Sequence, residues 1–168
     1  MIMEFTHLNE DGRGRMVNLA DKADTHREAI ASGRITLQPE TIARIREGSL
    51  AKGDVLGIAQ IAGIMAAKKT PDLIPLCHNI LLRGVDLSFD ITSTGVAVQA
   101  TIHTQGPTGA EMEALTAVSA ALLTIYDMCK AIDKTMEIQD ICLLRKTGGK
   151  SGTFERGGKT PDRADTET

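Results

Sequence analysis

Two short runs in the middle of the chain alternate apolar and polar residues, and they constrain the fold more than any other feature. The first run covers residues 85–91 and the second covers residues 96–102. Apolar side chains at every second position are typical of a β-strand with one buried face and one face in water. Thr92-Ser93-Thr94-Gly95 joins the two runs. The pattern predicts an antiparallel hairpin.

Helical patterns surround this hairpin. A helix is predicted over residues 110–130, where apolar residues recur at alternating spacings of three and four: Leu115, Val118, Leu122, Ile125 and Cys129. Residues 39–47 form another predicted helix, with Pro39 inside its start and Gly48 just after its end. A third long strand is expected over residues 135–146. A short helix is expected over residues 20–32, ended by Gly33, with a brief strand over residues 34–37.

The order of these elements predicts an α+β fold. Helices would pack on one face of a mostly antiparallel sheet, as in a ferredoxin-like sandwich. A length of 168 residues favours one domain. We expect an N-terminal arm over residues 1–20, a single α+β domain over 21–146, and a flexible glycine-rich and polar segment over 147–168.

A further helix is predicted over residues 54–68, with Asp54 as its N-cap. After its first turn this helix is apolar on all sides apart from Gln60. A helix that is apolar all round must be covered on all sides. In a chain of this size we expect a partner subunit to provide the cover.

Composition excludes several classes of protein. The net charge of -3 and an aromatic content of 2% argue against binding to nucleic acids. The three cysteines are far apart and form no CxxC pair, so neither a disulfide framework nor a metal site is expected. The apolar stretches look too short or too interrupted to span a membrane, and no signal peptide precedes them. We therefore expect a cytoplasmic location.

The loop Ile74–Asn79 brings a thiol and an imidazole side by side, at Cys77 and His78. A lone histidine is more often structural than catalytic, and Cys77 fits packing better than nucleophilic attack. The loop nevertheless follows a buried helix directly, which is where binding residues tend to lie. His78 is therefore a candidate ligand-binding residue.

A carboxylate and an ammonium, Asp127 and Lys130, lie three residues apart on one face of the helix over 110–130. They are either an acid/base pair or an ordinary exposed ion pair. Small residues share their side of the helix with Glu113, which leaves room for something to approach. Glu113 and Asp127 are about 21 Å apart along the helix axis, at the usual rise per residue. If both act, the site is expected to lie between subunits.

Several lysines lie at the ends of predicted elements: Lys52, Lys68, Lys69, Lys130, Lys146 and Lys150. Scattered lysines can serve solubility alone. Lys52, however, precedes a helix N-terminus, which favours a bound anion such as a triphosphate. Gly148–Gly152 does not fit the phosphate-binding P-loop template. This segment is either a glycine-rich flap with a phosphate-seeking Lys150 or a disordered tail.

At these residues the sequence closely resembles the molybdenum cofactor biosynthesis protein C family, the cyclic pyranopterin monophosphate synthases. The resemblance covers roughly residues 5–155. Its matching segments are 52–55, 62–64, 72–78, 108–117, 123–131 and 148–152. Members of the family more often carry proline where this chain has Asn79, and lysine where it has Pro107.

The resemblance implies a hexamer, a trimer of dimers with its sites at the dimer interface. It implies a nucleotide-derived substrate, 3′,8-cyclo-7,8-dihydro-GTP, and a product, cyclic pyranopterin monophosphate, formed with release of pyrophosphate and without a cofactor. Asp127 would be the principal acid/base residue, aided by Lys52 and Lys130. The substrate would be lined by Leu76, Cys77, His78, Glu111, Met112 and Glu113. Its phosphates would be surrounded by Arg27, Lys68, Lys146 and Lys150.

Two other interpretations remain open from the sequence. One is a catalytically silent nucleotide-binding or regulatory α+β domain, in which Asp127 and Lys130 could be exchanged without consequence. The other is a purely structural oligomer-forming protein, which only the apolar helix over 54–68 favours. Release of pyrophosphate from the cyclised GTP intermediate separates an enzyme from both.

Overall fold

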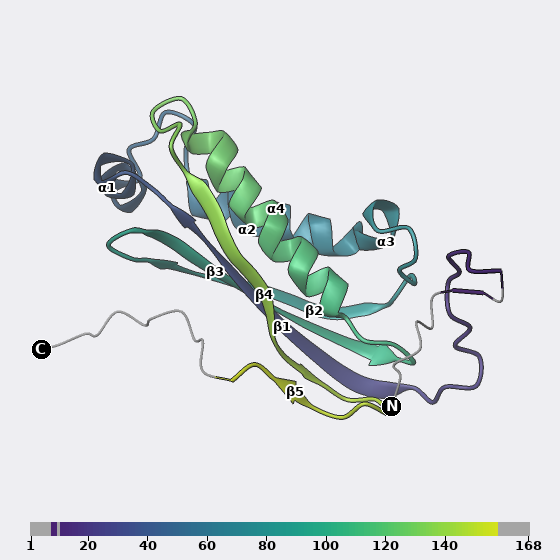
Figure 1. Cartoon of the computed structure of the whole chain (residues 1–168). Coiled ribbons are helices and arrows are strands. Elements are labelled where there is room, and N and C mark those ends of the chain that lie inside the picture. The colour runs from purple at the N-terminus through teal and green to yellow at the C-terminus, as the bar shows by residue number, and fades with distance from the viewer. Residues whose placement is uncertain (1–7, 10, 158–168) are drawn as a thin grey trace, which may run out of the picture.

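The computed structural model describes residues 8, 9 and 11–157, and it has an α+β fold. A single antiparallel sheet carries helices on one face (Figure 1). The order of the strands in the sheet is β2-β3-β1-β4-β5. In chain order the elements are β1 (Thr25–Thr36), α1 (Pro39–Glu47), α2 (Val55–Lys68), α3 (Thr70–Leu73), β2 (Leu82–Ile91), β3 (Gly95–Gly106), α4 (Glu111–Cys129), β4 (Glu137–Thr147) and β5 (Phe154–Glu155).

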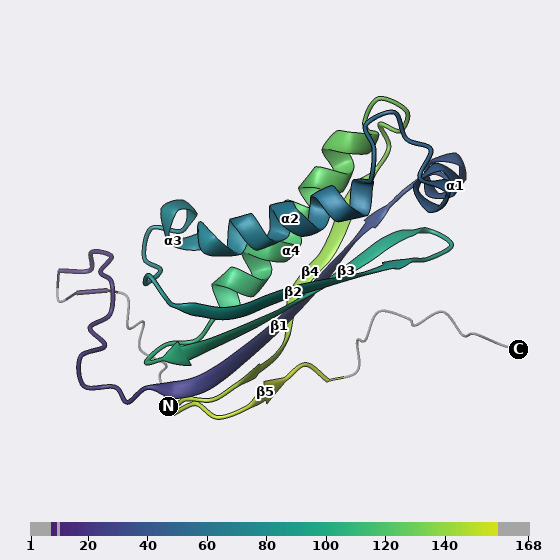
Figure 2. The ribbon, with the colours of Figure 1, turned by 180° about the vertical axis from the view of Figure 1, so that it is seen from behind.

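The first four strands with α2 and α4 give the ferredoxin-like arrangement that the sequence predicts. The predicted hairpin is confirmed as β2 and β3, which pair with Ile91 opposite Val96. The predicted long strand after α4 is confirmed as β4. Helix α4 lies across β1, β3 and β4, and α2 packs beside it on the same face (Figure 2).

The predicted helix boundaries at α1 and α2 are confirmed by their caps. Gly48 ends α1 in the left-handed conformation, with a φ of 64°. The Asp54 carboxylate starts α2 by accepting a hydrogen bond from the backbone N–H of Gly57, at 3.0 Å. The cap holds the segment that carries Lys52 against the N-terminus of α2.

The predicted helix over residues 20–32 is wrong, because residues 25–36 form the central strand β1. This strand pairs with β3 on one edge and β4 on the other. Pairing on both edges, with Ala29 and Ala31 fully buried in the core, outweighs the local helix propensity of a segment rich in alanine and charge. Gly33 therefore lies inside a strand, and the predicted strand over 34–37 is only the end of β1.

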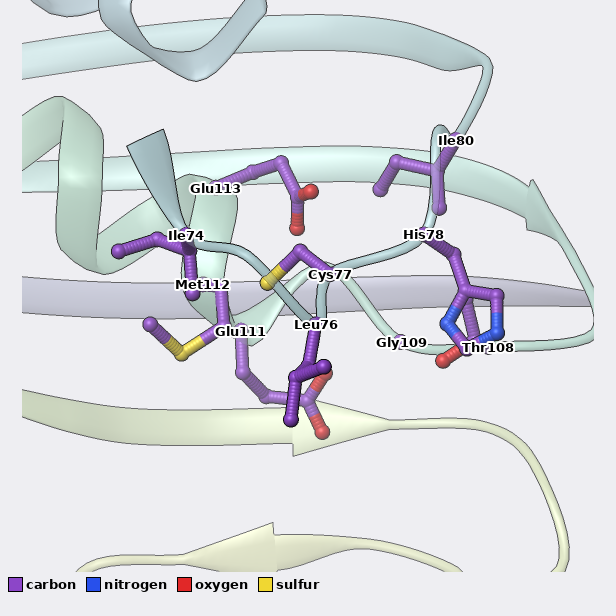
Figure 3. Close-up of a pocket in the computed structure, with 10 residues that line it drawn as sticks. All are labelled: Ile74, Leu76, Cys77, His78, Ile80, Thr108, Gly109, Glu111, Met112 and Glu113. Carbon is purple, nitrogen blue, oxygen red and sulfur yellow. The ribbon is translucent and has the colours of Figure 1, made fainter. Parts of the chain in front are cut away.

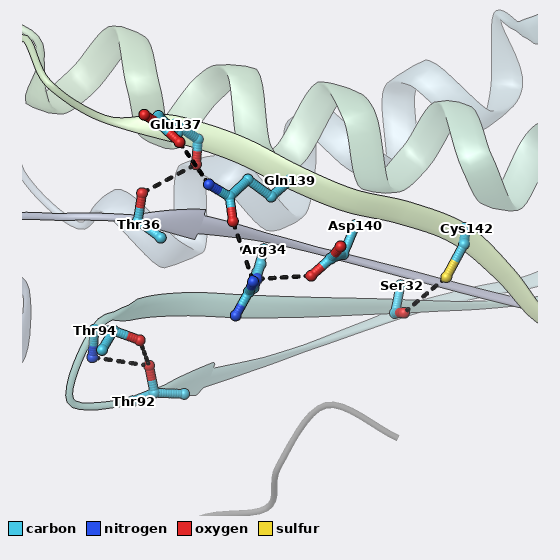
Figure 4. A network of polar contacts seen from close by, with 9 residues as sticks. All are labelled: Ser32, Arg34, Thr36, Thr92, Thr94, Glu137, Gln139, Asp140 and Cys142. Carbon is cyan, nitrogen blue, oxygen red and sulfur yellow. Dashed lines mark hydrogen bonds and ion pairs between the residues drawn. The ribbon is translucent and has the colours of Figure 1, made fainter. Parts of the chain in front are cut away.

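The face of the sheet away from the helices carries polar pairs (Figure 4). Arg34 Nε lies 2.8 Å from Asp140 Oδ2, and its Nη2 donates to Gln139 Oε1 at 3.1 Å. Both side chains of the ion pair are about half exposed or more. This face provides matched control residues that lie outside the candidate site described below.

The two ends of the chain are described only in part. Residues 1–7 and 10 of the predicted arm, and 158–168 of the predicted flexible segment, lie outside the described residues. Within the arm, Leu8 and Gly14 form an isolated antiparallel bridge. After β4, the two-residue strand β5 pairs with β4 at the sheet edge, with Phe154 opposite Lys146. The division into arm, domain and flexible segment stays a prediction.

By length and composition alone, α4 could span a membrane. The expectation that the apolar stretches are too short or too interrupted therefore does not hold for the length and composition of this helix. Half of its most apolar window is buried, however, between the sheet and α2. Burial of this kind is typical of the core helix of a soluble protein.

Candidate active site

One cluster of the predicted site residues lies at the C-terminal end of α4. We call it the aspartate–lysine cluster, made of Asp127, Lys52 and Lys130. Lys130 Nζ lies 2.6 Å from Asp127 Oδ1, and Lys52 Nζ lies 3.5 Å from Asp127 Oδ2. Lys52 Nζ also donates to the backbone carbonyl of Asp127, at 2.8 Å. The structure thus brings together the three residues that the sequence predicts as catalytic.

The electrostatics of this cluster favour the charged forms of Asp127 and Lys130. A hydrogen bond from Lys130, the charge of Lys130 and the charge of Lys52 lower the pKa of Asp127 below its usual value. The hydrogen bond and charge of Asp127 raise the pKa of Lys130 in turn. The Asp127 side chain remains 61% exposed. An accessible carboxylate between two ammonium groups can exchange protons with a ligand while the lysines hold an anion.

A cavity of about 450 Å³ lies at the other end of α4. We call it the loop pocket (Figure 3). Three segments line it: the chain after α3, the β3–α4 loop and the first turn of α4. Its volume suits a small-molecule ligand. Its lining residues are Ile74, Leu76, Cys77, His78, Ile80, Thr108, Gly109, Glu111, Met112 and Glu113.

Glu113 is the titratable group buried most deeply in the loop pocket, with 3% of its surface exposed. Burial, and then the charge of Glu111, raise the pKa of Glu113 to about 7. Burial, and then the charge of Glu113, raise the pKa of Cys77. Near neutral pH, Glu113 can therefore hold or release a proton, whereas Cys77 stays a thiol.

Two predicted phosphate-binding residues make contacts at the rim of the loop pocket. Lys146 Nζ lies 3.3 Å from Glu111 Oε1 and donates to Ser151 Oγ at 2.9 Å. Arg27 donates from Nε to the carbonyl of Gly106 at 2.9 Å and from Nη2 to that of Pro107 at 3.0 Å. The guanidinium therefore holds the β3–α4 loop.

Arg27 also contacts the glycine-rich turn after β4. Gly149 adopts a φ of 75°, and a Cβ there would collide with the Arg27 guanidinium. Arg27 thus lies between two loops that flank the loop pocket. The remaining predicted phosphate-binding residues, Lys68 at the end of α2 and Lys150 in this turn, are both exposed.

The small residues of α4 have a different role from the one predicted. Glu113 and Ala117 are buried and do not share an exposed face with Asp127. The space beside the small residues is occupied by α2. A Cβ at Gly63 of α2 would lie 3.0 Å from the Ala117 carbonyl oxygen. At this point of the stripe, a second helix approaches α4 closely.

Four residues that line the loop pocket have no role predicted from the sequence: Ile74, Ile80, Thr108 and Gly109. Thr108 and Gly109 stand in a segment shared with the resembling family, which is a signal that could have identified them. Ile80 opens the short apolar run Ile80-Leu81-Leu82, which leads into β2, and it carries no such signal. Within residues 8, 9 and 11–157, no group of three or more His, Cys, Asp or Glu side chains could hold a metal ion.

Comparisons with known proteins agree on one family. A model described as the MoaC family matches residues 16–149. A cyclic pyranopterin monophosphate synthase from Peptoclostridium acidaminophilum is 59% identical over 154 residues, covering 92% of this chain and 98% of that protein. A protein of the same name from Clostridium acetobutylicum is 57% identical, covering 92% and 97%. Another, from a Roseiflexus species, is 58% identical, covering 90% and 97%.

Proposed function

The chain belongs to the MoaC family, and on that premise we propose that it is a cyclic pyranopterin monophosphate synthase of molybdenum cofactor biosynthesis. It converts 3′,8-cyclo-7,8-dihydro-GTP into cyclic pyranopterin monophosphate by acid/base catalysis and releases pyrophosphate. The observation that carries the proposal is the similarity to relatives of that name. They are 57 to 59% identical, and the matches cover 92% of this chain.

The geometry of the aspartate–lysine cluster supports this chemistry. Opening the guanine ring and building a pterin require several proton transfers, and cyclising the phosphate requires neutralisation of the departing pyrophosphate. Asp127 supplies an accessible carboxylate for the proton transfers. Lys52 and Lys130 supply positive charge within 3.5 Å of it. We assign the catalytic roles to these three residues.

The loop pocket is the proposed site for the heterocycle of the substrate. Its walls are mainly apolar, and Glu113 and His78 place polar groups among them. Leu76, Cys77 and Met112 would contact the ring. The phosphates would be surrounded by Arg27, Lys68, Lys146 and Lys150, directly or by holding loops. Glu111 would line the substrate beside Lys146.

The two clusters are proposed to form one site across an interface between copies. Within one chain, Glu113 and Asp127 are separated by about 21 Å along α4. Ile58, Ile61 and Met65 of α2 are 46 to 60% exposed, as is Leu123 of α4 at 60%. Apolar side chains in such a group favour a protein partner. The proposed assembly is a trimer of dimers located in the cytoplasm.

A pyrophosphate assay tests the proposed activity. Purified protein is incubated with 3′,8-cyclo-7,8-dihydro-GTP, and pyrophosphate and the cyclic monophosphate are measured together. The proposal expects the two products in equal amounts. Binding of the nucleotide without either product would contradict it and would favour a silent nucleotide-binding domain.

A further inference from the structure

The imidazole of His78 lies between the N-terminal arm and the loop pocket. Its Nε2 atom is 2.6 Å from the carbonyl oxygen of Val17, sixty-one residues earlier in the chain. The same ring lines the loop pocket, as does Thr108 (Figure 3). One side of the ring is therefore held by the arm, while another side faces the ligand space.

The partner of Nε2 decides where the proton of the neutral ring resides. A backbone carbonyl oxygen can only accept a hydrogen bond. Nε2 must therefore carry the hydrogen in this contact. A neutral imidazole has a single N–H group, so Nδ1 is then left without a hydrogen and can accept one.

The arm also passes close to the same loop at Gly14. A Cβ at Gly14 would lie 3.6 Å from Cδ1 of Leu76, two residues before His78. Gly14 itself pairs with Leu8 in the isolated bridge of the arm. The arm thus bonds to the loop at His78 through the Val17 carbonyl and lies close to it at Gly14.

From these contacts we propose that Val17 fixes neutral His78 in the Nε2–H form, so that Nδ1 accepts a hydrogen bond from an N–H or O–H group of the bound heterocycle. The inference rests on the proposed function for the identity of that ligand. The role of the arm does not depend on it. His78 is a specificity-determining acceptor in a pocket whose walls are mainly apolar, and the arm is its positioning element.

Nitrogen NMR of the ligand-free, full-length protein tests the tautomer directly. Protonated and unprotonated imidazole nitrogens resonate in separate regions, and a His78→Gln spectrum assigns the signals of His78. The spectra are recorded as a pH series, and the tautomer is assigned where the nitrogen signals no longer change as the pH rises and the ring is neutral. The proposal expects Nε2 protonated and Nδ1 unprotonated. The opposite pattern would overturn it, whatever the enzyme's activity.

Steady-state kinetics of two variants test the role of Nδ1. In His78→Gln, a side-chain N–H can still reach the Val17 carbonyl, but the amide oxygen that accepts hydrogen bonds does not stand at the position of Nδ1. We expect an unchanged melting temperature and a kcat/KM lowered by about tenfold, the loss expected for one neutral hydrogen bond. The matched control is His103→Gln, since His103 lies on the far face of the sheet beside Glu28. It should behave as wild type.

Wild-type kcat/KM in His78→Gln would exclude Nδ1 as an acceptor for the ligand. A wild-type protein that binds substrate but releases no pyrophosphate would instead contradict the proposed function. In that case the NMR result would still decide the tautomer. The two failures are therefore distinguishable.

Discussion

At the residue scale, we propose Asp127 as the principal acid/base residue, acting from its ionised form as a proton acceptor. Its carboxylate is exposed, yet two lysines hold its pKa below the usual value. Asp127→Asn removes the charge and the proton acceptor while keeping the shape of the side chain. We expect kcat to fall by about 10² to 10⁴-fold, with the oligomer intact. The rate of pyrophosphate release and size-exclusion chromatography measure the two effects.

Asp140→Asn is the matched control for Asp127→Asn. Asp140 is also an exposed carboxylate in an ion pair, at 2.8 Å from Arg34, but on the open face of the sheet. Its φ of 55° is one that asparagine tolerates. This variant should keep wild-type kcat. Near-normal turnover in Asp127→Asn would remove Asp127 from the mechanism.

The raised pKa of Glu113 predicts a pH dependence of stability. In the folded protein this pKa is about 7, against an ordinary value of 4.5. Between these two values the unfolded chain releases a proton that the folded protein keeps. The free energy of unfolding should therefore fall by up to about 3 kcal/mol as pH rises from 4.5 to 7, and then stay level.

Glu113→Gln isolates this contribution, because glutamine has similar size and does not titrate. Relative to wild type, the variant should gain melting temperature as the pH rises from 4.5 to 7, at a fixed protein concentration. A difference in melting temperature that is constant across this range would show that Glu113 ionises at its ordinary pKa.

At the scale of elements, the sequence predicts the helices and strands that a local residue pattern marks. The hairpin and α4 have clear periods of two and 3.6, and α1 and α2 have recognisable caps. β1 has no such pattern. Residues such as Ala29 and Ala31 become strand residues because β3, β4 and α4 surround them. This segment is a strand because of contacts that form only in the folded chain.

The contacts of the candidate site also fall into two groups, those that local sequence predicts and those that depend on tertiary structure. Asp127 and Lys130 were predictable as neighbours because one helix turn joins them. Lys52 is seventy-five residues from Asp127 in the chain, and its hydrogen bond depends on how α2 packs against α4. The bonds from Arg27 to the β3–α4 loop also depend on tertiary structure. Family resemblance named these residues, but it did not show what they contact.

Arg27 connects two elements that flank the loop pocket, so its replacement should disturb both. In Arg27→Lys, one ammonium group cannot reproduce the two guanidinium hydrogen bonds to the carbonyls of Gly106 and Pro107. We expect kcat/KM to fall by about tenfold, which corresponds to the loss of one such bond, and the amide resonances of Thr108 and Gly109 to shift.

Arg34→Lys is the control for this substitution, since Arg34 lies in an exposed ion pair away from the loop pocket. It should change neither kcat/KM nor those resonances. Unshifted Thr108 and Gly109 signals in Arg27→Lys, together with lost activity, would assign Arg27 to the substrate and not to the loop.

At the scale of the whole molecule, we propose that each site combines the aspartate–lysine cluster of one copy with the loop pocket of another. The two clusters lie at opposite ends of the same helix. Exposed apolar side chains on α2 and α4 provide a surface for a second copy. An interface with twofold symmetry would bring both kinds of cluster together twice.

Mixing two inactive variants tests this claim most directly. Asp127→Asn and Glu113→Gln proteins are co-expressed with different tags, and the mixed oligomers are purified. If the site is shared, random pairing restores about a quarter of the sites to wild type, since each cluster comes from an independent copy. The account predicts pyrophosphate release near that fraction of the wild-type rate. Activity no higher than that of the two separate variants would contradict it, because every chain would then carry a defect in its own site.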